Sequence, residues 1–253
     1  MKIDIITVFP EMLAGFLETS MLKRAAKSGA AEFGLINPRT FTDDPHRSTD
    51  DRPYGGGPGM VMLADPLVRA TESVAAPESK IIMMSPSGKT FRQEDARRLA
   101  KEQHLVFICG HYEGIDDRVR RLLNPAELSI GDYILTNGAL SAAVVVDSVV
   151  RLLPGVLGGG DAAANDESFE NGLLDFPQFT RPPEYRNLRV PEILQNGNHG
   201  AIAAWRLAES KRITLERRPD LAAKAGLIPS PDPRPSPGNR EFSTQHHKTL
   251  TVP

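Results

Sequence analysis

The sequence predicts an α/β fold in which helices cover both faces of a parallel β-sheet. The first observation is that four segments are almost continuously apolar, as strands buried on both faces are: residues 2–9, 80–85, 104–109 and 127–135. The second is that segments with helical periodicity alternate with them: residues 65–74, 92–102, 114–123 and 140–153. The last helix is apolar nearly all round, so we expect it to be buried, and a second subunit is one surface that could cover it.

Changes of composition along the chain predict two domains, a linker and a tail. Residues 1–157 hold the alternation of strands and helices. Residues 158–175 are rich in glycine, alanine and acidic side chains without periodicity, which indicates a flexible acidic linker. Residues 176–227 carry more basic than acidic side chains and contain a long helical pattern with Asn198 as its expected N-cap. Residues 228–253 are rich in proline and poor in bulky apolar side chains, so we expect a disordered tail.

The composition also argues against several classes of protein. A net charge of -2 is unlike that of a protein that coats nucleic acid generally, and no apolar run reaches the roughly 18 residues of a membrane span. Cys109 is the only cysteine, which leaves no disulfide framework and is typical of a cytoplasmic protein. The segment SGKT lacks the first glycine of a P-loop, and the histidines have no zinc-site spacing. The residues therefore predict no metal site.

Three glycine-containing loops indicate a ligand site at one edge of the predicted sheet. They read SPSGKT, CGHYEG and TNGAL, and each follows a predicted strand. Because the carboxyl ends of parallel strands meet at one edge, the loops should lie together, and their glycines would let main-chain groups meet a ligand directly. Such a site suits an adenine or a folded nucleoside. Gly131, inside a predicted strand, also indicates that another group approaches the backbone closely.

Longer blocks of the sequence resemble the bacterial tRNA (guanine-N1)-methyltransferase family. In order they read DDRPYGGGPGM, CGHYEGIDDRV, SIGDYIL, RLLPGVLG, GLLDFPQFTRPPEY and WRLAESKRITLERRPDL, and they agree with the family over residues 1–222. The family belongs to the SPOUT class of S-adenosylmethionine-dependent methyltransferases. The resemblance therefore implies a deep trefoil knot in residues 1–157, a homodimer with the active site at the subunit interface, and tRNA binding by the helical domain of residues 176–227.

The resemblance further implies a cofactor site and a substrate. The substrate would be the guanosine at position 37 of tRNA, on the 3′ side of the anticodon and after another guanosine, methylated on N1. S-adenosyl-L-methionine would be the methyl donor, and magnesium support is a family-level expectation. By similarity, the donor would contact Gly110, Ile130, Gly131, Asp132, Tyr133, Ile134 and Leu135, with Ser85, Pro86, Tyr112, Glu113 and Gly138 beside them.

The catalytic residues are also assigned by resemblance. Guanine N1 carries a proton that must be removed before N1 can attack; the resemblance implies that a carboxylate removes it as general base and that a cation near O6 stabilises the charge that develops. The resemblance assigns the cation to Arg151 and places the base in an aspartate just before Ser-Phe. This chain reads Asn-Asp-Glu-Ser-Phe there. Asp166 is favoured because it has the family's residue type, and Glu167, directly before Ser168, is the alternative.

The remaining assignments concern tRNA. The guanine-side pocket is expected to involve Asp50, Arg52 and Tyr54, and tRNA phosphates are expected to contact Arg181, Arg206, Lys211, Arg212, Arg217 and Arg218. The chain departs from the family at His111, at Asn137 and Ala139, and at Ser141, which puts the affinity for the donor in question. Two alternatives stay open: a SPOUT-fold RNA methyltransferase with another target, and a catalytically weak homologue that binds RNA.

Overall fold

A computed structural model describes residues 1–158, 167–169 and 171–228 of the chain. The chain divides into two compact units, Met1–Glu170 and Asn171–Pro253, and each is described by itself. Most of the predicted linker, and the predicted tail from residue 229 onward, lie outside the described residues. In the described part of the chain, no helix is both long and apolar enough to cross a membrane.

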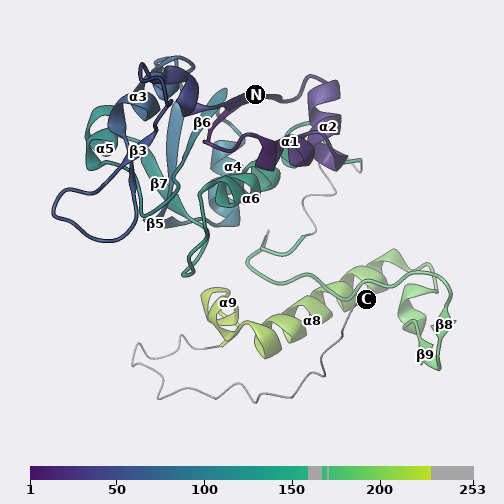
Figure 1. The fold of residues 1–253 in the computed structure, drawn as a ribbon. Helices are drawn as coiled ribbons and strands as arrows, with labels where there is room; N and C mark the ends of the chain where they lie inside the picture. The colour runs from purple at the N-terminus through teal and green to yellow at the C-terminus, as the bar shows by residue number, and fades with distance from the viewer. Residues whose placement is uncertain (159–166, 170, 229–253) are drawn as a thin grey trace, which may run out of the picture. The chain divides into compact units, whose positions relative to one another are not determined.

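The first unit is built on a five-stranded parallel sheet with the strand order β2-β1-β6-β5-β7 (Figure 1). The strands are β1 (Lys2–Ile6), β2 (Glu32–Ile36), β5 (Lys80–Thr90), β6 (His104–Cys109) and β7 (Ala126–Ser129). The predicted parallel α/β sheet is therefore confirmed. Strand β2 is not among the predicted strands, because its five residues are interrupted by Gly34. A Cβ there would lie 1.9 Å from Oδ1 of Asp4, a buried carboxylate that His104 Nε2 contacts at 2.8 Å.

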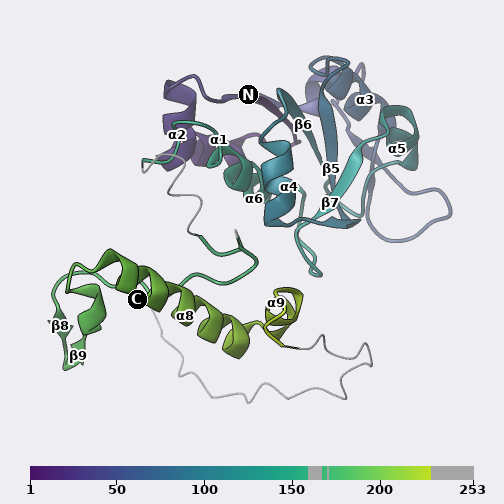
Figure 2. The ribbon, with the colours of Figure 1, turned by 180° about the vertical axis from the view of Figure 1, so that it is seen from behind.

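Helices cover both faces of this sheet, as predicted (Figures 1 and 2). They are α1 (Glu11–Leu17), α2 (Ser20–Lys27), α3 (Ala64–Glu72), α4 (Gln93–Leu99), α5 (Asp117–Leu123) and α6 (Ala139–Val150). Helices α1, α2, α4 and α6 pack on one face and α3 and α5 on the other. Two helices, α1 and α2, are not among the predicted elements. They are short, and most of the stability of such helices comes from tertiary packing.

The core forms two layers because side chains alternate along each strand. Along β1 and β6, one set of buried side chains faces α1, α2, α4 and α6: Ile3, Ile5, Leu105 and Phe107. The opposite set faces α3 and α5: Ile6, Val106 and Ile108. Helix α6 lies in the first layer, where Val145, Val146, Val149 and Val150 are fully buried. The central strands thus bury side chains on both faces of the sheet. This burial explains the nearly continuous apolar runs from which the strands are predicted.

Three predicted strands differ from the structure at their carboxyl ends. The strand predicted over residues 2–9 ends at Ile6. The strand predicted over residues 127–135 ends at Ser129, and the following residues form an irregular segment. Strand β5 runs past the predicted end at residue 85, but it bulges: Met84 and Lys89 both pair with Leu128, and residues 85–88 project from the ladder. The departures of β5 and β7 lie at the edge where the ligand site is predicted.

Short elements complete the first unit. The 3-10 helix η1 (Pro38–Phe41) precedes a small antiparallel pair, β3 (Asp50–Asp51) and β4 (Val61–Met62). The pair carries the glycine-rich loop between residues 52 and 60. Val61–Met62 is anchored beside the cavity described below, because Met62 N donates a hydrogen bond to Gly114 O at 2.9 Å.

The second unit is mainly helical, as expected for residues 176–227. It contains β8 (Glu184–Tyr185), β9 (Leu188–Arg189), η2 (Glu192–Leu194), α8 (His199–Arg217) and α9 (Pro219–Lys224). The Asn198 side chain accepts a hydrogen bond from Ala201 N at 3.1 Å, which confirms the predicted N-cap. Leu174 is fixed to α8 by its backbone, since its N donates to Thr214 Oγ1 and its O accepts from Ser210 Oγ.

Candidate active site

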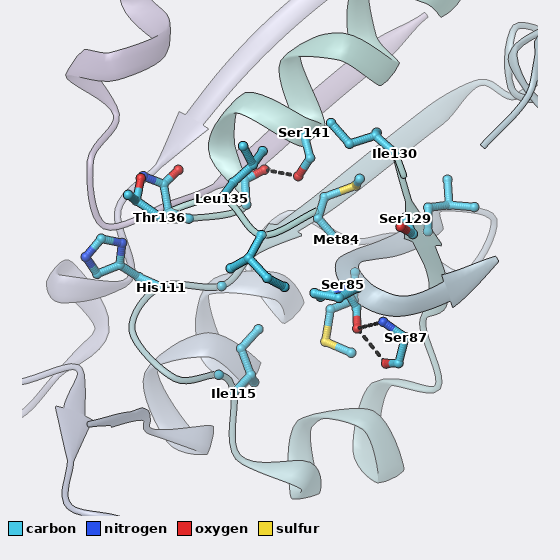
Figure 3. Close-up of a pocket in the computed structure, with 18 of the residues that line it drawn as sticks. Met84, Ser85, Ser87, His111, Ile115, Ser129, Ile130, Leu135, Thr136 and Ser141 are labelled. Carbon is cyan, nitrogen blue, oxygen red and sulfur yellow. Dashed lines mark hydrogen bonds between the residues drawn. The ribbon is translucent and has the colours of Figure 1, made fainter. Parts of the chain in front are cut away.

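A cavity of about 550 Å³ lies at the carboxyl ends of β5, β6 and β7. Ligand sites of small molecules commonly have this size and this place in a parallel sheet. Figure 3 shows it enclosed by side chains from three separate segments, with Ser85 and Ser87 on one side, Leu135 and Thr136 on another, and Ile115 below. Two of these segments are the predicted loops SPSGKT and CGHYEG, the second with Ile115 after it. The third runs from residue 128 to 138, so it consists mostly of residues predicted as a strand, and only residues 136–138 of the predicted loop TNGAL line the cavity.

The first loop is the bulge of residues 85–88. It needs glycine at its end, because a Cβ on Gly88 would lie 2.5 Å from Leu128 N of the neighbouring strand. Its serines are linked to each other: Ser85 Oγ and Ser87 Oγ lie 2.7 Å apart, and Ser87 N donates to Ser85 Oγ at 3.2 Å. The bulge therefore presents hydroxyl and main-chain groups to the cavity instead of pairing them in the sheet.

The second loop, residues 110–114, turns sharply and holds the glycine-rich loop of residues 52–60. Tyr112 adopts φ +60° and Gly114 φ +151°, which lie in the left-handed range. Met60 N donates a hydrogen bond to the Glu113 carboxylate at 2.8 Å. In return, the backbone N of Glu113 donates one to Met60 O at 3.1 Å. The Glu113 carboxylate thus fills the space where a side chain on Gly59 would sit, 1.8 Å from its Cβ position.

The third loop, residues 130–138, crosses close to the second. Gly138 N donates a hydrogen bond to Gly110 O at 2.8 Å, and a Cβ on Gly138 would lie 3.0 Å from Cys109 Cα. The need for glycine at Gly131 has a source within the chain: φ is +147°, and a Cβ would lie 2.6 Å from the Tyr133 ring. The tyrosine two residues later is therefore a neighbour of this backbone within the chain itself, and the approach of a ligand to Gly131 stays a prediction.

Eleven of the twelve residues suggested for the cofactor line this cavity. The exception is Asp132, whose side chain is exposed and lies outside the lining. The lining also contains residues that were not suggested: Met83, Met84, Ser87, His111, Gly114, Ile115, Arg120, Leu128, Ser129, Thr136, Asn137 and Ser141. Most of them follow in sequence from those suggested, because each loop lines the cavity with a run of neighbours.

The chemistry of the lining fits an adenosine-like donor. Met84, Ile115 and Leu135 give apolar walls, and glycines in the second and third loops leave main-chain groups open to a ligand. His111 Nδ1 is buried and has no hydrogen-bond partner among the described residues, and its ring packs against the rings of Phe9 and Tyr112 at centroid distances of 5.0 and 4.4 Å. Cys109, beneath the cavity, is fully enclosed in the core, and this burial raises the pKa of its thiol, so it is not a nucleophile.

The suggested catalytic residues form a contact outside the cavity. Arg151 lies at the end of α6, and its Nη2 is 2.5 Å from Oε1 of Glu167. Neither residue lines the cavity. Asp166, the favoured base, lies outside the described residues. The geometry thus brings together Arg151 and the alternative base.

The residues suggested for the guanine side lie on or beside the pair β3–β4. Asp50 pairs with Met62, whereas Arg52 and Tyr54 are exposed on the glycine-rich loop. Asp44, near this loop along the chain, binds the backbone N–H groups of Ser48 and His46, and these hydrogen bonds lower its pKa. The loop that carries the candidate contacts is held at its base by the pairing of β3 with β4, and Tyr54 near its tip is exposed.

The six basic residues suggested for tRNA lie in the second unit and are exposed or half-buried. Three have contacts within that unit. Arg212 pairs with Glu209 and Glu216, Arg206 lies 4.7 Å over the Phe176 ring, and Arg218 pairs with Asp220. The hydrogen bond from Arg218 lowers the pKa of Asp220 to about 2. For the other three, Arg181, Lys211 and Arg217, the described residues provide no ion-pair partner.

Comparison with known proteins gives the family. The model of the tRNA (Guanine-1)-methyltransferase TrmD family matches residues 1–224. The chain belongs to this family. A tRNA (guanine-N(1)-)-methyltransferase of Moorella thermoacetica is 51% identical over 233 residues, which cover 90% of this chain and 93% of that protein. Proteins of the same name from Geobacillus kaustophilus (54%; 87% and 91% covered) and Thermomicrobium roseum (55%; 90% and 86% covered) are similar to the same extent.

The family membership agrees with the resemblance found in the sequence, and the observed sheet is that of an α/β methyltransferase of this family. Within the described residues, no group of three or more histidine, cysteine or acidic side chains could hold a metal ion. The residues of the cavity, by contrast, suit a methyl donor of nucleoside type.

Proposed function

We propose that this chain transfers a methyl group from S-adenosylmethionine to N1 of guanosine 37 in tRNA. The observation that carries the proposal is the cavity at the carboxyl ends of β5, β6 and β7, which three loops of a methyltransferase family enclose. Main-chain groups at Gly110, Gly131 and Gly138 would hold the nucleoside, and Ile115 and Leu135 would contact its apolar surface. When bound, the donor supplies a methyl group on a positively charged sulfur.

The chain's own residues would prepare guanine N1 for attack. A carboxylate accepts the N1 proton, and the guanidinium of Arg151 faces O6 and stabilises the negative charge that develops there. The contact between Arg151 and Glu167 supports Glu167 as this carboxylate, because base and cation must reach neighbouring atoms of one guanine. The N1 lone pair then forms the new bond to the methyl carbon as the bond from carbon to sulfur breaks.

The site would be completed by a second copy of the chain. Arg151 and Glu167 do not line the cavity of their own chain, so we propose that they face the cavity of a partner in a homodimer. Exposed apolar side chains support this arrangement: Ile134 is 79% exposed, Leu140 48% and Val144 47%. Leu140 and Val144 lie on α6, a helix that is apolar nearly all round and is buried on its other side.

The dimer has its own test. Leu140→Glu combined with Val144→Glu places charges on the proposed interface without touching the core. Sedimentation should show dimers for the wild-type chain and single chains for the variant, with methyl transfer lost. A wild-type protein that sediments as single chains would contradict the proposed dimer.

The reaction is tested with labelled S-adenosylmethionine and an unmodified tRNA transcript that carries guanosines at positions 36 and 37. Label should enter this transcript and not one with adenosine at position 37. Glu167→Ala should abolish transfer, whereas Asp166→Ala should retain most of it. The opposite result would make Asp166 the base. Label that enters the adenosine transcript equally would favour an RNA methyltransferase with another target.

One set of residues bears on the alternative of a weak homologue. Three positions at which the chain departs from the family line the cavity, namely His111, Asn137 and Ser141. Asn137 is used internally, since its Oδ1 accepts a hydrogen bond from Ala139 N at 2.9 Å. Ser141 Oγ donates to Gly138 O at 2.8 Å. Both departures therefore brace the third loop, which supports an active site over a degenerate one. The trefoil knot and magnesium support remain predictions.

A further inference from the structure

Glu127 lies outside the lining of the cavity but holds side chains that belong to it. On strand β7, its Oε1 accepts a hydrogen bond from Arg120 Nε at 2.9 Å, and its Oε2 accepts one from Arg120 Nη2 at 3.1 Å. The same Oε2 accepts a third hydrogen bond from Ser87 Oγ at 3.2 Å. Arg120 and Ser87 both line the cavity, and they come from helix α5 and from the bulge of β5. One carboxylate thus joins three elements.

The contact is a charged one in a partly enclosed place. The side chain of Glu127 is 28% exposed and that of Arg120 35%. Burial raises the pKa of Glu127, but the hydrogen bonds and charge of Arg120 lower it by more. The pKa of Glu127 therefore lies below its usual value, and the carboxylate is ionised at neutral pH. The hydrogen bond to Glu127 raises the pKa of Arg120. Asp117 is the other acidic group near this guanidinium, with its Oδ1 3.6 Å from Arg120 Nη1.

The bulge depends on such contacts because the sheet does not fix it. Met84 and Lys89 pair with the same residue of β7, so residues 85–88 have no ladder partners of their own. Gly88 packs against the β7 backbone, and Ser87 is tied to Glu127 on one side and to Ser85 Oγ at 2.7 Å on the other. Without Glu127, the two serines would keep their contact with each other and lose the one with β7.

We propose that Glu127 is a positioning residue for the methyl donor. By binding Arg120 and Ser87 at once, it fixes the bulge of β5 and the arginine of α5 as one rigid wall of the cavity. This inference rests on the proposed function, because it takes S-adenosylmethionine to be the ligand of that cavity. A wall fixed before binding affects the donor equally in the ground state and in the transition state, so its loss should raise KM and leave kcat unchanged.

The test is Glu127→Gln, which keeps the shape of the side chain and removes its charge. KM for S-adenosylmethionine should rise about tenfold, the change expected when about 1.4 kcal/mol of binding is lost, with kcat within about twofold of wild type. Asp43→Asn is the matched control, because it breaks the exposed pair with Arg69 elsewhere in the same unit. It should leave KM and kcat unchanged.

Two further measurements separate a positioning role from a structural one. In a background of Arg120→Met, Glu127→Gln should raise KM less than it does in the wild-type chain, because the partner through which it acts is gone. If Glu127→Gln does not fold, Glu127→Asp keeps the charge and shortens the reach, and it should raise KM severalfold.

Four results bear on the inference. A KM unchanged in both Glu127 variants overturns it, and so does a fall in kcat with KM unchanged. Equal effects of Glu127→Gln in both backgrounds also overturn it. Wild-type protein that binds no S-adenosylmethionine in calorimetry overturns the proposed function instead, and this result is seen before any variant is made.

Discussion

The close approach of two loops at Gly138 gives a prediction that the structure makes quantitative. A Cβ at this position would lie 3.0 Å from Cys109 Cα and 3.1 Å from Gly110 N, both of them backbone atoms. Ordinary contacts of a Cβ begin near 3.4 Å, so Gly138→Ala must push the second and third loops apart by a few tenths of an ångström. The backbone of Gly138 has φ -79°, which alanine adopts freely, so the effect isolates the steric contact.

Overpacking of this kind lowers the free energy of unfolding by about 1–3 kcal/mol. For a unit of this size, each kcal/mol lowers the melting temperature by about 2–4 °C, so scanning calorimetry should show a fall of roughly 2–12 °C. S-adenosylmethionine should also bind more weakly, because the displaced backbone belongs to the cavity wall. The hydrogen bond from Gly138 N to Gly110 O at 2.8 Å would lengthen at the same time.

Gly15→Ala provides the control. Gly15 lies in helix α1, and a Cβ there would meet no atom within 4 Å. Alanine should therefore stabilise the chain by about 0.5–1 kcal/mol through helix propensity, with no change in donor binding. The reasoning would be refuted by a Gly138→Ala protein that melts at or above the wild-type temperature and binds the donor with wild-type affinity.

Two further predictions concern charges. Burial raises the pKa of Asp95, but hydrogen bonds from Lys89 and Arg98 lower it more, so the folded-state pKa lies below the ordinary 3.8. Asp95→Asn should lower the free energy of unfolding by about 1.5–3 kcal/mol at pH 7. Denaturant titrations should show that this difference between wild type and variant shrinks as the pH falls from 3.8 through the folded-state pKa of Asp95. An equal difference at pH 7 and pH 2 would contradict this. Lys211→Ala should reduce the salt dependence of tRNA binding by about one counterion. Arg212→Ala should reduce it less, because two glutamates of α8 already bind that guanidinium, and equal slopes for the two variants would count against this.

The central strands of the sheet can be predicted from the sequence, because a strand that is buried on both faces needs apolar side chains at nearly every position. Residues 81–84 of β5 and 105–109 of β6 are continuously apolar, three of the five residues of β1 are isoleucines, and the parallel pairing follows from the helices between the strands. Edge strand β2 leaves a weaker record. Its central glycine accommodates the carboxylate of Asp4, a contact with a residue 30 positions earlier that no local pattern contains.

The place of the cavity can also be predicted, but its walls cannot be worked out in full. Three glycine loops after three parallel strands indicate the correct edge. The contact between Glu127 and Arg120 leaves no such signal, because a glutamate and an arginine seven residues apart are ordinary in a soluble protein. The contact between Glu167 and Arg151 is equally hidden. Residue type favours Asp166, which lies outside the described residues, and the contact of Glu167 with Arg151 follows from the fold alone.

Gly131 shows why a glycine in a strand pattern does not by itself reveal a ligand. The pattern requires that a side chain be absent there, and the structure agrees, with φ at +147° and no room for a Cβ. The group nearest to such a Cβ is the ring of Tyr133, an exposed side chain that the same segment supplies. A missing side chain records a steric or conformational demand without its source. The source becomes visible only when the chain ends its strand at Ser129 and folds the next nine residues into a wall.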